Sequence, residues 1–378
     1  MADAVRTDLV SRADPIVVKV GTNVLADAAG ALDRRRVQAL ADQLARVRAA
    51  GRRVALVSSG AIGAGVGRLG LGKRPVDLPH LQACAAVGQC ALMDAYQEAL
   101  AGHGAHVAQI LLTAGDFDHR VRYLNARHTI LTLFEYGCLP VINENDTVSV
   151  AEIKFGDNDH LAAMVSNLLQ APLLVLLTNV DGLFTADPGT DPAARLVPTV
   201  PHIDRTVTEM AAPTHSALGT GGMRSKLRAA RLVTAAGGAV IMANGSVDGV
   251  LDAVFAGEAV GTLFLPHREA LSARRRWLGL TARPKGAFRL DDGARRAVET
   301  AGRSLLPVGV VAVTGTFGKG DVVSLCGSDG IEFARGLTNY SSADAERIRG
   351  LATDQILRAV GKVPYVEMVH RDNLAVVG

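Results

Sequence analysis

A chain of 378 residues is long enough for two domains, because single hydrophobic cores stop growing at about 250 to 300 residues. Apolar residues make up 48% of the chain and charged residues 20%, which excludes disordered and fibrous proteins and is typical of α/β enzymes. The net charge of +3 is too small to indicate a nucleic-acid-binding protein by itself.

The sequence predicts a cytoplasmic protein. Residues 1–12 contain two Asp and two Arg but no long apolar core, so we expect a frayed tail there rather than a signal peptide. No apolar run reaches the roughly 18 residues of a membrane helix. The cysteines lack C-x-x-C spacing, so we expect buried free thiols, as in a reducing compartment, rather than disulfides or a zinc site. They are Cys84, Cys90, Cys138 and Cys326.

From residue 16 to about residue 265, short β-branched runs alternate with helical patterns, which predicts a mostly parallel sheet with helices on both faces. We expect helices at residues 34–49, behind Asp33 as the N-cap, and at 80–101, 116–136 and 160–169. These elements predict one three-layer αβα domain over residues 1–266. The expected strands are residues 16–20, 53–59, 106–112, 138–142, 173–177 and 239–242.

Lys19 lies within the first apolar run and is followed by Gly21. An unpaired ammonium group is costly in such surroundings, so Lys19 needs an anionic partner. A glycine directly after the strand allows the backbone to approach a phosphate closely. The alternative is an edge strand with Lys19 turned to water.

A turn of small residues, 59–65, follows the second strand and begins with Ser59. Its N–H groups and hydroxyl could hold a carboxylate or a phosphate; a tight packing turn between strand and helix explains the same residues equally well. Residues 65–70 match G-x-G-x-x-G, but they begin six residues after the strand and lack the matching acid, so we do not predict a dinucleotide-binding fold.

Acids and amides cluster after the fourth strand, in Asn143-Glu144-Asn145-Asp146 and in Gly156-Asp157-Asn158-Asp159. In parallel α/β sheets, ligands bind beyond the carboxyl ends of the strands, so these segments predict a site for a small polar molecule. The alternative is that Asp157, Asn158 and Asp159 only cap the next helix.

A glycine-rich segment, residues 219–222, opens a further helix that carries Lys226 one turn in. Flexible glycines, a helix N-terminus and a lysine together favour a polyphosphate site, although a mobile surface loop is the alternative. The Walker A sequence and the protein-kinase motifs H-R-D and D-F-G do not occur, so a phosphoryl-transfer enzyme would need another architecture.

The pattern changes near residue 266. We predict a linker at residues 267–274, a β-rich domain at 275–365 and a C-terminal tail at 366–378. Strands are expected at residues 308–314 and 321–326, joined by a hairpin-like connection, which indicates a small barrel. The eight Lys and Arg residues within 271–296 permit RNA binding, but a solvated face is the more usual explanation.

In this combination and order, the motifs resemble the glutamate 5-kinases, a family of amino acid kinases with a C-terminal PUA domain. The resemblance covers the chain from about residue 16 to nearly its end. It is carried by Val18-Lys19-Val20-Gly21-Thr22, Ser59-Gly60-Ala61-Ile62, Asn125-Ala126-Arg127, residues 141–146, 156–159 and 183–188, and Gly219-Thr220-Gly221-Gly222-Met223.

The resemblance implies ATP-dependent phosphorylation of the L-glutamate side-chain carboxylate, the first step of proline synthesis, with Mg²⁺ as cofactor. It implies that Lys19 and Lys226 contact the phosphates and that Asp159 orients both lysines. Glutamate would be bound by Ser59, Asp146, Asn158, Asn143 and Asp157. Asn179 stands where an aspartate is more usual. The implied ATP-binding residues are Lys19, Thr178, Asn179, Thr220, Gly221, Gly222, Met223, Arg224, Ser225 and Lys226.

Further expectations follow from the same resemblance. They are proline as a feedback inhibitor, a homodimer or homotetramer, product hand-over to glutamate-5-semialdehyde dehydrogenase, and RNA binding by the PUA domain as an open possibility. Two alternatives stay open: an amino acid kinase acting on acetylglutamate, aspartate, carbamate or UMP, and an RNA-binding protein with a kinase-like scaffold.

Overall fold

The computed structural model describes residues 3–27, 30–148, 158–211, 222–267, 277–352, 355–356 and 365–376. The chain divides into two compact units, Met1–Ala270 and Leu271–Gly378. The division falls inside the segment expected as a linker. In the described part of the chain, no helix combines the length and the apolar character needed to cross a bilayer.

The first unit is built on an eight-stranded sheet with the order β3-β4-β2-β1-β5-β7-β8-β6. Its neighbouring strands are parallel except for the antiparallel pair β7 and β8. β1 lies between β2 and β5, so Lys19 belongs to an interior strand and the edge-strand alternative is wrong. The strands are β1 (Ile16–Val20), β2 (Val54–Ser58), β3 (His106–Leu112), β4 (Cys138–Glu144), β5 (Leu173–Thr178), β6 (Thr199–Val200), β7 (Ala239–Asn244) and β8 (Thr262–Phe264).

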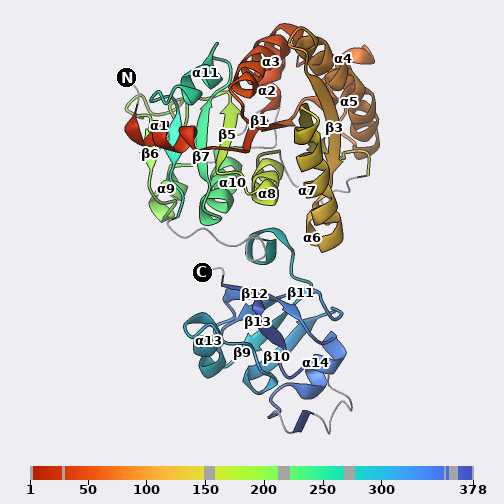
Figure 1. Ribbon diagram of the computed structural model, residues 1–378, viewed down its shortest axis with the longest axis vertical. Helices are drawn as coiled ribbons and strands as arrows, with labels where there is room; N and C mark the ends of the chain where they lie inside the picture. Colours follow the sequence, from red (N-terminus) through yellow and green to blue (C-terminus); the bar gives the residue numbers. More distant parts are fainter. Residues whose placement is uncertain are drawn as a thin grey trace. The chain divides into compact units, whose positions relative to one another are not determined.

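Helices cover both faces of this sheet, as Figure 1 shows. One face carries α3 (Arg34–Ala49), α5 (Leu78–Ala101) and α11 (Val250–Phe255), and the other carries α7 (Arg120–Glu135), α8 (Asn158–Leu169) and α10 (Met223–Ala235). The remaining helices are α1 (Ala4–Ser11), α2 (Thr22–Leu25), α4 (Ala61–Arg68), α6 (Ala114–Asp118) and α9 (Arg205–Met210). The three-layer arrangement expected from the sequence is thus present.

The helix bounds confirm one prediction in detail and correct another. α3 spans the predicted residues, and Asp33 caps it by accepting a hydrogen bond from the Arg35 N–H at 2.9 Å. The single helix expected at residues 116–136 is wrong, because His119 adopts an extended conformation and separates α6 from α7.

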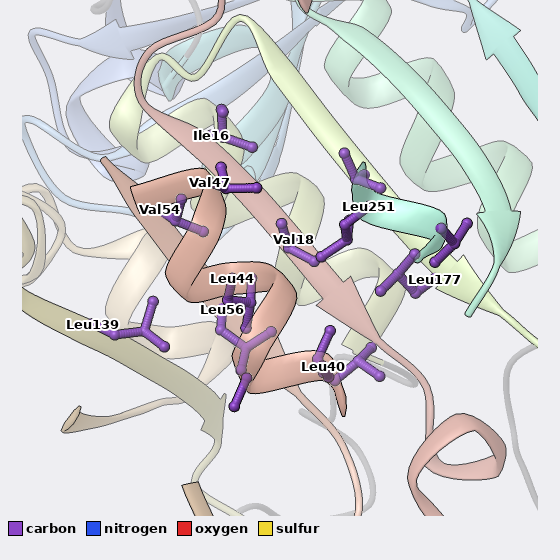
Figure 2. Packing of buried hydrophobic residues seen from close by; sticks show 14 of the residues in the cluster. Ile16, Val18, Leu40, Leu44, Val47, Val54, Leu56, Leu139, Leu177 and Leu251 are labelled. Atoms are coloured by element: carbon purple, nitrogen blue, oxygen red, sulfur yellow. The ribbon is translucent and has the colours of Figure 1, made fainter. Parts of the chain in front are cut away.

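The apolar side chains of α3 form much of the core on their face of the sheet. Figure 2 shows Leu40, Leu44 and Val47 of α3 packed over the strand residues Val18 and Leu56. All five side chains are at most 5% exposed. Burying a side chain of this size contributes about 1.5 to 3 kcal/mol, so this layer fixes the helix against the centre of the sheet.

The predicted frayed N-terminus is wrong, because residues 4–11 form α1. The guanidinium group of Arg6 is buried and donates hydrogen bonds to the carbonyl oxygens of Pro198 at 2.7 Å and Gly261 at 3.2 Å. These backbone acceptors lie next to β6 and β8, and they are not recognisable in the sequence. They tie α1 to the far edge of the sheet.

The second unit contains a five-stranded sheet with the order β10-β9-β11-β12-β13. Since β9 lies between β10 and β11, the predicted hairpin joining the two strands is wrong. β13 pairs with β12, so the predicted tail at residues 366–378 contains a strand. The elements are β9 (Gly286–Leu290), β10 (Val310–Gly315), β11 (Val322–Cys326), β12 (Glu332–Thr338), β13 (Val369–Val376), α13 (Asp292–Glu299), α14 (Ser342–Ile348), and the short helices η1 (Trp277–Thr281) and η2 (Pro307–Gly309).

The four cysteines are free thiols, as predicted. Only Cys84 is buried, however; Cys138 and Cys326 are half-buried and Cys90 is exposed on α5. The expectation that all four are buried is wrong, because apolar neighbours in the sequence do not determine which face of an element a side chain occupies.

Candidate active site

Two lysines that are distant in the sequence contact the same carboxylate. The Nζ atom of Lys19 lies 2.6 Å from Oδ1 of Asp159, and the Nζ atom of Lys226 lies 3.0 Å from Oδ2. Ser225 also donates a hydrogen bond to Oδ2, at 3.1 Å. All of these side chains are buried, with exposed fractions below 10%. The three charged groups therefore form one ionic cluster, and capping is not the only role of Asp159.

The elements of the fold explain why the cluster forms. Lys19 is in β1 at the centre of the sheet. Asp159 is in the first turn of α8, and Lys226 is the fourth residue of α10. α8 packs against both β1 and α10, and ten of its twelve residues are buried. The helix thus presents Asp159 between a strand on one side and a helix on the other.

Within the described residues, the cluster joins two lysines to one carboxylate. Burial raises the pKa of Asp159, but the positive charges of Lys19 and Lys226 outweigh this effect and lower the pKa to about 2. Asp159 is therefore ionised near neutral pH, and two ammonium groups share one carboxylate. Buried ammonium groups need anionic partners, so this site is suited to an anionic ligand.

A second polar cluster lies directly beside the first. Nδ2 of Asn158 donates to Oγ of Ser59 at 2.8 Å, to Oδ1 of Asn143 at 3.0 Å and to the carbonyl oxygen of Ser58 at 3.2 Å. Ser59 follows β2 and Asn143 lies near the end of β4. Because β2 and β4 are parallel neighbours, their carboxyl ends meet at the same edge of the sheet. The structure thus brings together Ser59, Asn143 and Asn158, as the sequence predicts.

Further buried polar residues support this second cluster, and sequence reasoning missed them. Gln89 of α5 accepts a hydrogen bond from Nδ2 of Asn143 at 3.0 Å and donates to Gln109 at 3.0 Å. The hydroxyl oxygen of Tyr96 lies 2.9 Å from Oγ of Ser58, and burial raises the pKa of Tyr96. The sequence does contain one signal for Gln89. It shares the apolar face of its helix with Ala85 and Gly88, where a polar side chain is unusual.

The predicted nucleotide residues lie at neighbouring positions of the same sheet edge. Thr178 ends β5 and is 3% exposed, and its hydroxyl donates to Oδ1 of Asn179 at 3.3 Å. Gly222 is the N-cap residue of α10, followed by Met223 and by Arg224, which donates to the carbonyl oxygen of Ala211 at 3.2 Å. Asp146 is half-buried in the turn after β4. Asp157, Thr220 and Gly221 lie outside the described residues.

The acidic groups of the site offer little to a metal ion. Both oxygens of Asp159 face ammonium groups, so this carboxylate is not free to coordinate a cation. Within the described ranges, no three His, Cys, Asp or Glu side chains form a group that could hold a metal.

Comparisons with known proteins identify the family of this chain. Residues 14–244 match the amino acid kinase family and residues 286–360 match the PUA domain. The glutamate 5-kinase of Geobacter sulfurreducens is 47% identical over 371 residues, covering 98% of this chain and 100% of that protein. The glutamate 5-kinase of Pseudomonas savastanoi pv. phaseolicola is 47% identical over 361 residues, covering 96% and 98%.

Among solved structures, the carbamate kinase from Giardia lamblia bound to AMP-PNP has a TM-score of 0.49 and 19% sequence identity, covering 68% of this chain and 100% of that chain. The family models and the full-length relatives agree with the fold. This chain belongs to the amino acid kinase family and carries a PUA domain in its second unit.

Proposed function

We propose that this protein transfers the γ-phosphoryl group of ATP to the side-chain carboxylate of L-glutamate, giving L-glutamyl 5-phosphate and ADP. The observation that carries the proposal is that Asn158 and Asp159 are consecutive. Asp159 contacts the two lysines, whereas Asn158 contacts Ser59 and Asn143. An anion site and a site for a small polar molecule therefore adjoin at the first turn of one helix, as direct transfer between two bound substrates requires.

The chemistry needs charge stabilisation more than proton transfer. A glutamate side chain has a pKa of about 4.3, so the nucleophile is ionised near neutrality and needs no general base. Its approach to ATP brings negative charges together, and stabilising that charge is the main task in phosphoryl transfer. We propose that Lys19 and Lys226 contact the phosphate oxygens and that Asp159 orients both ammonium groups without accepting a proton.

The second polar cluster is the proposed binding site for the amino acid. Oγ of Ser59 accepts a hydrogen bond from Asn158, which leaves the Ser59 hydroxyl hydrogen to donate to the α-carboxylate. The N–H groups of Asn158 are directed at Ser58, Ser59 and Asn143, so its Oδ1 is the atom that remains to accept from the α-ammonium group. Asp146 at the same sheet edge supplies an anionic partner for that ammonium group, and Asn143 and Asp157 complete the proposed pocket.

The nucleotide would lie on the opposite side of Asp159. Thr178 and Asn179 at the end of β5, together with residues 220–226 at the start of α10, are the proposed contacts. Mg²⁺ would neutralise charge on the phosphate oxygens when it is bound with ATP. The relatives named glutamate 5-kinase, which match nearly the whole chain, support the choice of glutamate as acceptor.

An acyl phosphate of glutamate is the activated carboxylate that begins proline synthesis, and we propose this place for the reaction. Feedback inhibition by proline, assembly into dimers or tetramers, hand-over to glutamate-5-semialdehyde dehydrogenase, RNA binding by the PUA domain and a cytoplasmic location stay predictions.

A substrate panel tests the proposal. ADP release is measured with MgATP and glutamate, acetylglutamate, aspartate, carbamate or UMP. We expect glutamate to exceed every other acceptor by at least about a hundredfold in kcat/KM. Acetylglutamate, carbamate and UMP lack the α-ammonium group, the α-carboxylate or both, which leaves buried groups of the site unpaired, and the side chain of aspartate is one methylene too short to bring its carboxylate to the phosphoryl group. Faster turnover of another acceptor, or no ADP release with any of them, would contradict it.

A further inference from the structure

Two backbone groups fix which way the side-chain amides of the second polar cluster are oriented. The Glu144 N–H donates to Oδ1 of Asn143 at 2.9 Å, so Nδ2 of Asn143 must point the other way. The carbonyl oxygen of Ser58 accepts from Nδ2 of Asn158, which orients that amide in the same manner. A backbone N–H only donates and a carbonyl only accepts, so neither side-chain amide can be reversed without placing like groups against each other.

This orientation leaves one buried donor that needs a partner away from the substrate. Nδ2 of Asn143 points into the protein, where Asn143 is 3% exposed and water does not reach it freely. Oε1 of Gln89 accepts from it at 3.0 Å, and Nε2 of Gln89 in turn donates to Gln109 on β3. Gln89 is itself 8% exposed, so it reaches Asn143 from α5 through the interior.

We propose that Gln89 is a positioning residue for the amino acid substrate, acting through Asn143 on Asn158. Without Gln89, the inward N–H of Asn143 loses the acceptor that it has among the described residues, and a buried unsatisfied donor is unfavourable enough to make the side chain rotate against the hold of the Glu144 N–H. This rotation withdraws Oδ1 of Asn143 from Asn158. The side-chain amide of Asn158 is then free to turn, so it no longer orients the Ser59 hydroxyl or its own Oδ1, the proposed acceptor for the α-ammonium group. The inference rests on the proposed function, because it assigns Gln89 to the glutamate side of the site.

The same contacts separate Gln89 from the nucleotide side. In the described part of the chain, its hydrogen bonds join Asn143 and Gln109 rather than Lys19, Asp159 or Lys226, and Asn143 is linked to the ionic cluster by way of Asn158, the residue before Asp159. A loss at Gln89 should therefore raise the KM for glutamate and leave the KM for ATP and the kcat nearly unchanged. Replacing a residue with a purely structural role would change both KM values and kcat together, or would change only the melting temperature.

The test compares Gln89→Met with Gln97→Met. Gln97 is on the same helix, and its Oε1 accepts a hydrogen bond from the Val107 N–H of β3 at 3.2 Å, so its replacement also removes a contact between α5 and β3. For Gln89→Met we expect the KM for glutamate to rise about tenfold, the size of effect of one unsatisfied buried donor, with the KM for ATP and kcat within about twofold. For Gln97→Met we expect all three constants within about twofold.

Two further measurements make the outcome decisive. In an Asn143→Ala background, Gln89→Met should cause no additional rise in the KM for glutamate, because its effect passes through Asn143. Gln89→Leu also removes the acceptor for Asn143, so it serves in the same comparison if Gln89→Met does not fold, with the same rise in the KM for glutamate expected.

Three results would overturn the inference: an unchanged KM for glutamate in folded Gln89→Met, an equal rise in the KM for ATP, or full additivity with Asn143→Ala. The wild-type protein is assayed first. No turnover of glutamate there overturns the proposed function and this inference together, whereas wild-type turnover with an unchanged KM in Gln89→Met overturns the inference alone.

Discussion

Lys19 and Lys226 contact opposite oxygens of the one carboxylate of Asp159, at 2.6 and 3.0 Å. The first lysine belongs to the central strand and the second to a helix on one face of the sheet, so the pairing depends on the complete fold of the first unit. It places two buried ammonium groups at the sheet edge where ligands bind in α/β proteins.

Replacing either lysine should remove transition-state stabilisation. For Lys19→Ala and Lys226→Ala we expect kcat to fall about a hundredfold to a thousandfold, since one removed charge stabiliser costs about 2.7 to 4 kcal/mol in the transition state. Steady-state kinetics on folded protein measure this. Lys285→Ala is the control, because that lysine is half-exposed in the second unit and pairs with Asp321. A kcat unchanged in either site variant would exclude that lysine from the mechanism.

The stability of the protein should depend on the ionisation of Asp159 in acid. Its pKa falls from 3.8 in the unfolded chain to about 2 in the folded protein, so the folded state holds fewer protons between these values. The resulting stabilisation is complete above about pH 4, amounts to about 2 kcal/mol, and is lost as the pH falls toward 2. Urea unfolding of wild type and Asp159→Asn from pH 6 to pH 2 measures it.

We expect the difference in unfolding free energy between these two proteins to shrink as the pH falls. Asp252→Asn is the control, because that carboxylate pairs with Arg46 on the surface, where an ion pair contributes at most about 1 kcal/mol. A difference between wild type and Asp159→Asn that stays constant down to pH 2 would contradict the assigned pKa.

Two glycines bring α4 and α5 into backbone contact. A Cβ atom at Gly88 would lie 1.8 Å from the carbonyl oxygen of Ala61, and one at Gly65 would lie 1.8 Å from that of Cys84. Gly88→Ala must therefore separate the helices, and we expect a loss of about 3 kcal/mol in unfolding free energy. Gly72→Ala has open space around its Cβ and should stay within about 0.5 kcal/mol of wild type. Urea unfolding compares them, and equal stabilities would refute the contact.

The buried guanidinium of Arg6 gives a prediction for the N-terminal helix. Arg6→Met removes the guanidinium hydrogen bonds to the carbonyl oxygens of Pro198 and Gly261, of which Pro198 keeps the Leu263 N–H as a donor, so we expect a loss of about 2 to 3 kcal/mol. Arg12→Met removes only an exposed ion pair with Asp8 and should cost less than about 1 kcal/mol. Thermal unfolding of both variants is the measurement, and a smaller effect at Arg6 than at Arg12 would show that α1 is not held by this residue.

The sequence predicts the layer architecture because strand and helix periodicities are local properties. The six expected strands and the helix behind Asp33 all occur, whereas β6 and β8 were missed because they have only two and three residues. The hairpin expected near residues 315–320 failed for a different reason. The pairing of β9 between β10 and β11 is a long-range choice that no turn sequence reveals.

The residues of the candidate site likewise divide into those that the sequence reveals and those that only the structure reveals. Lysine in an apolar strand and acids after a strand end are unusual locally, so the sequence singles out Lys19, Asn158 and Asp159. Gln89 and Tyr96 lie on the mostly apolar buried face of α5, and their importance depends on which buried groups they meet. Arg6 escaped notice because its acceptors are backbone carbonyls of residues far along the chain.

The most direct test of phosphoryl transfer to a carboxylate is trapping with hydroxylamine, which converts an acyl phosphate into a stable hydroxamate. With wild-type protein, MgATP and L-glutamate, the account predicts glutamyl hydroxamate in an amount equal to the ADP released. Lys226→Ala should reduce both products about a hundredfold or more. Release of ADP by the wild type without any hydroxamate would contradict the account.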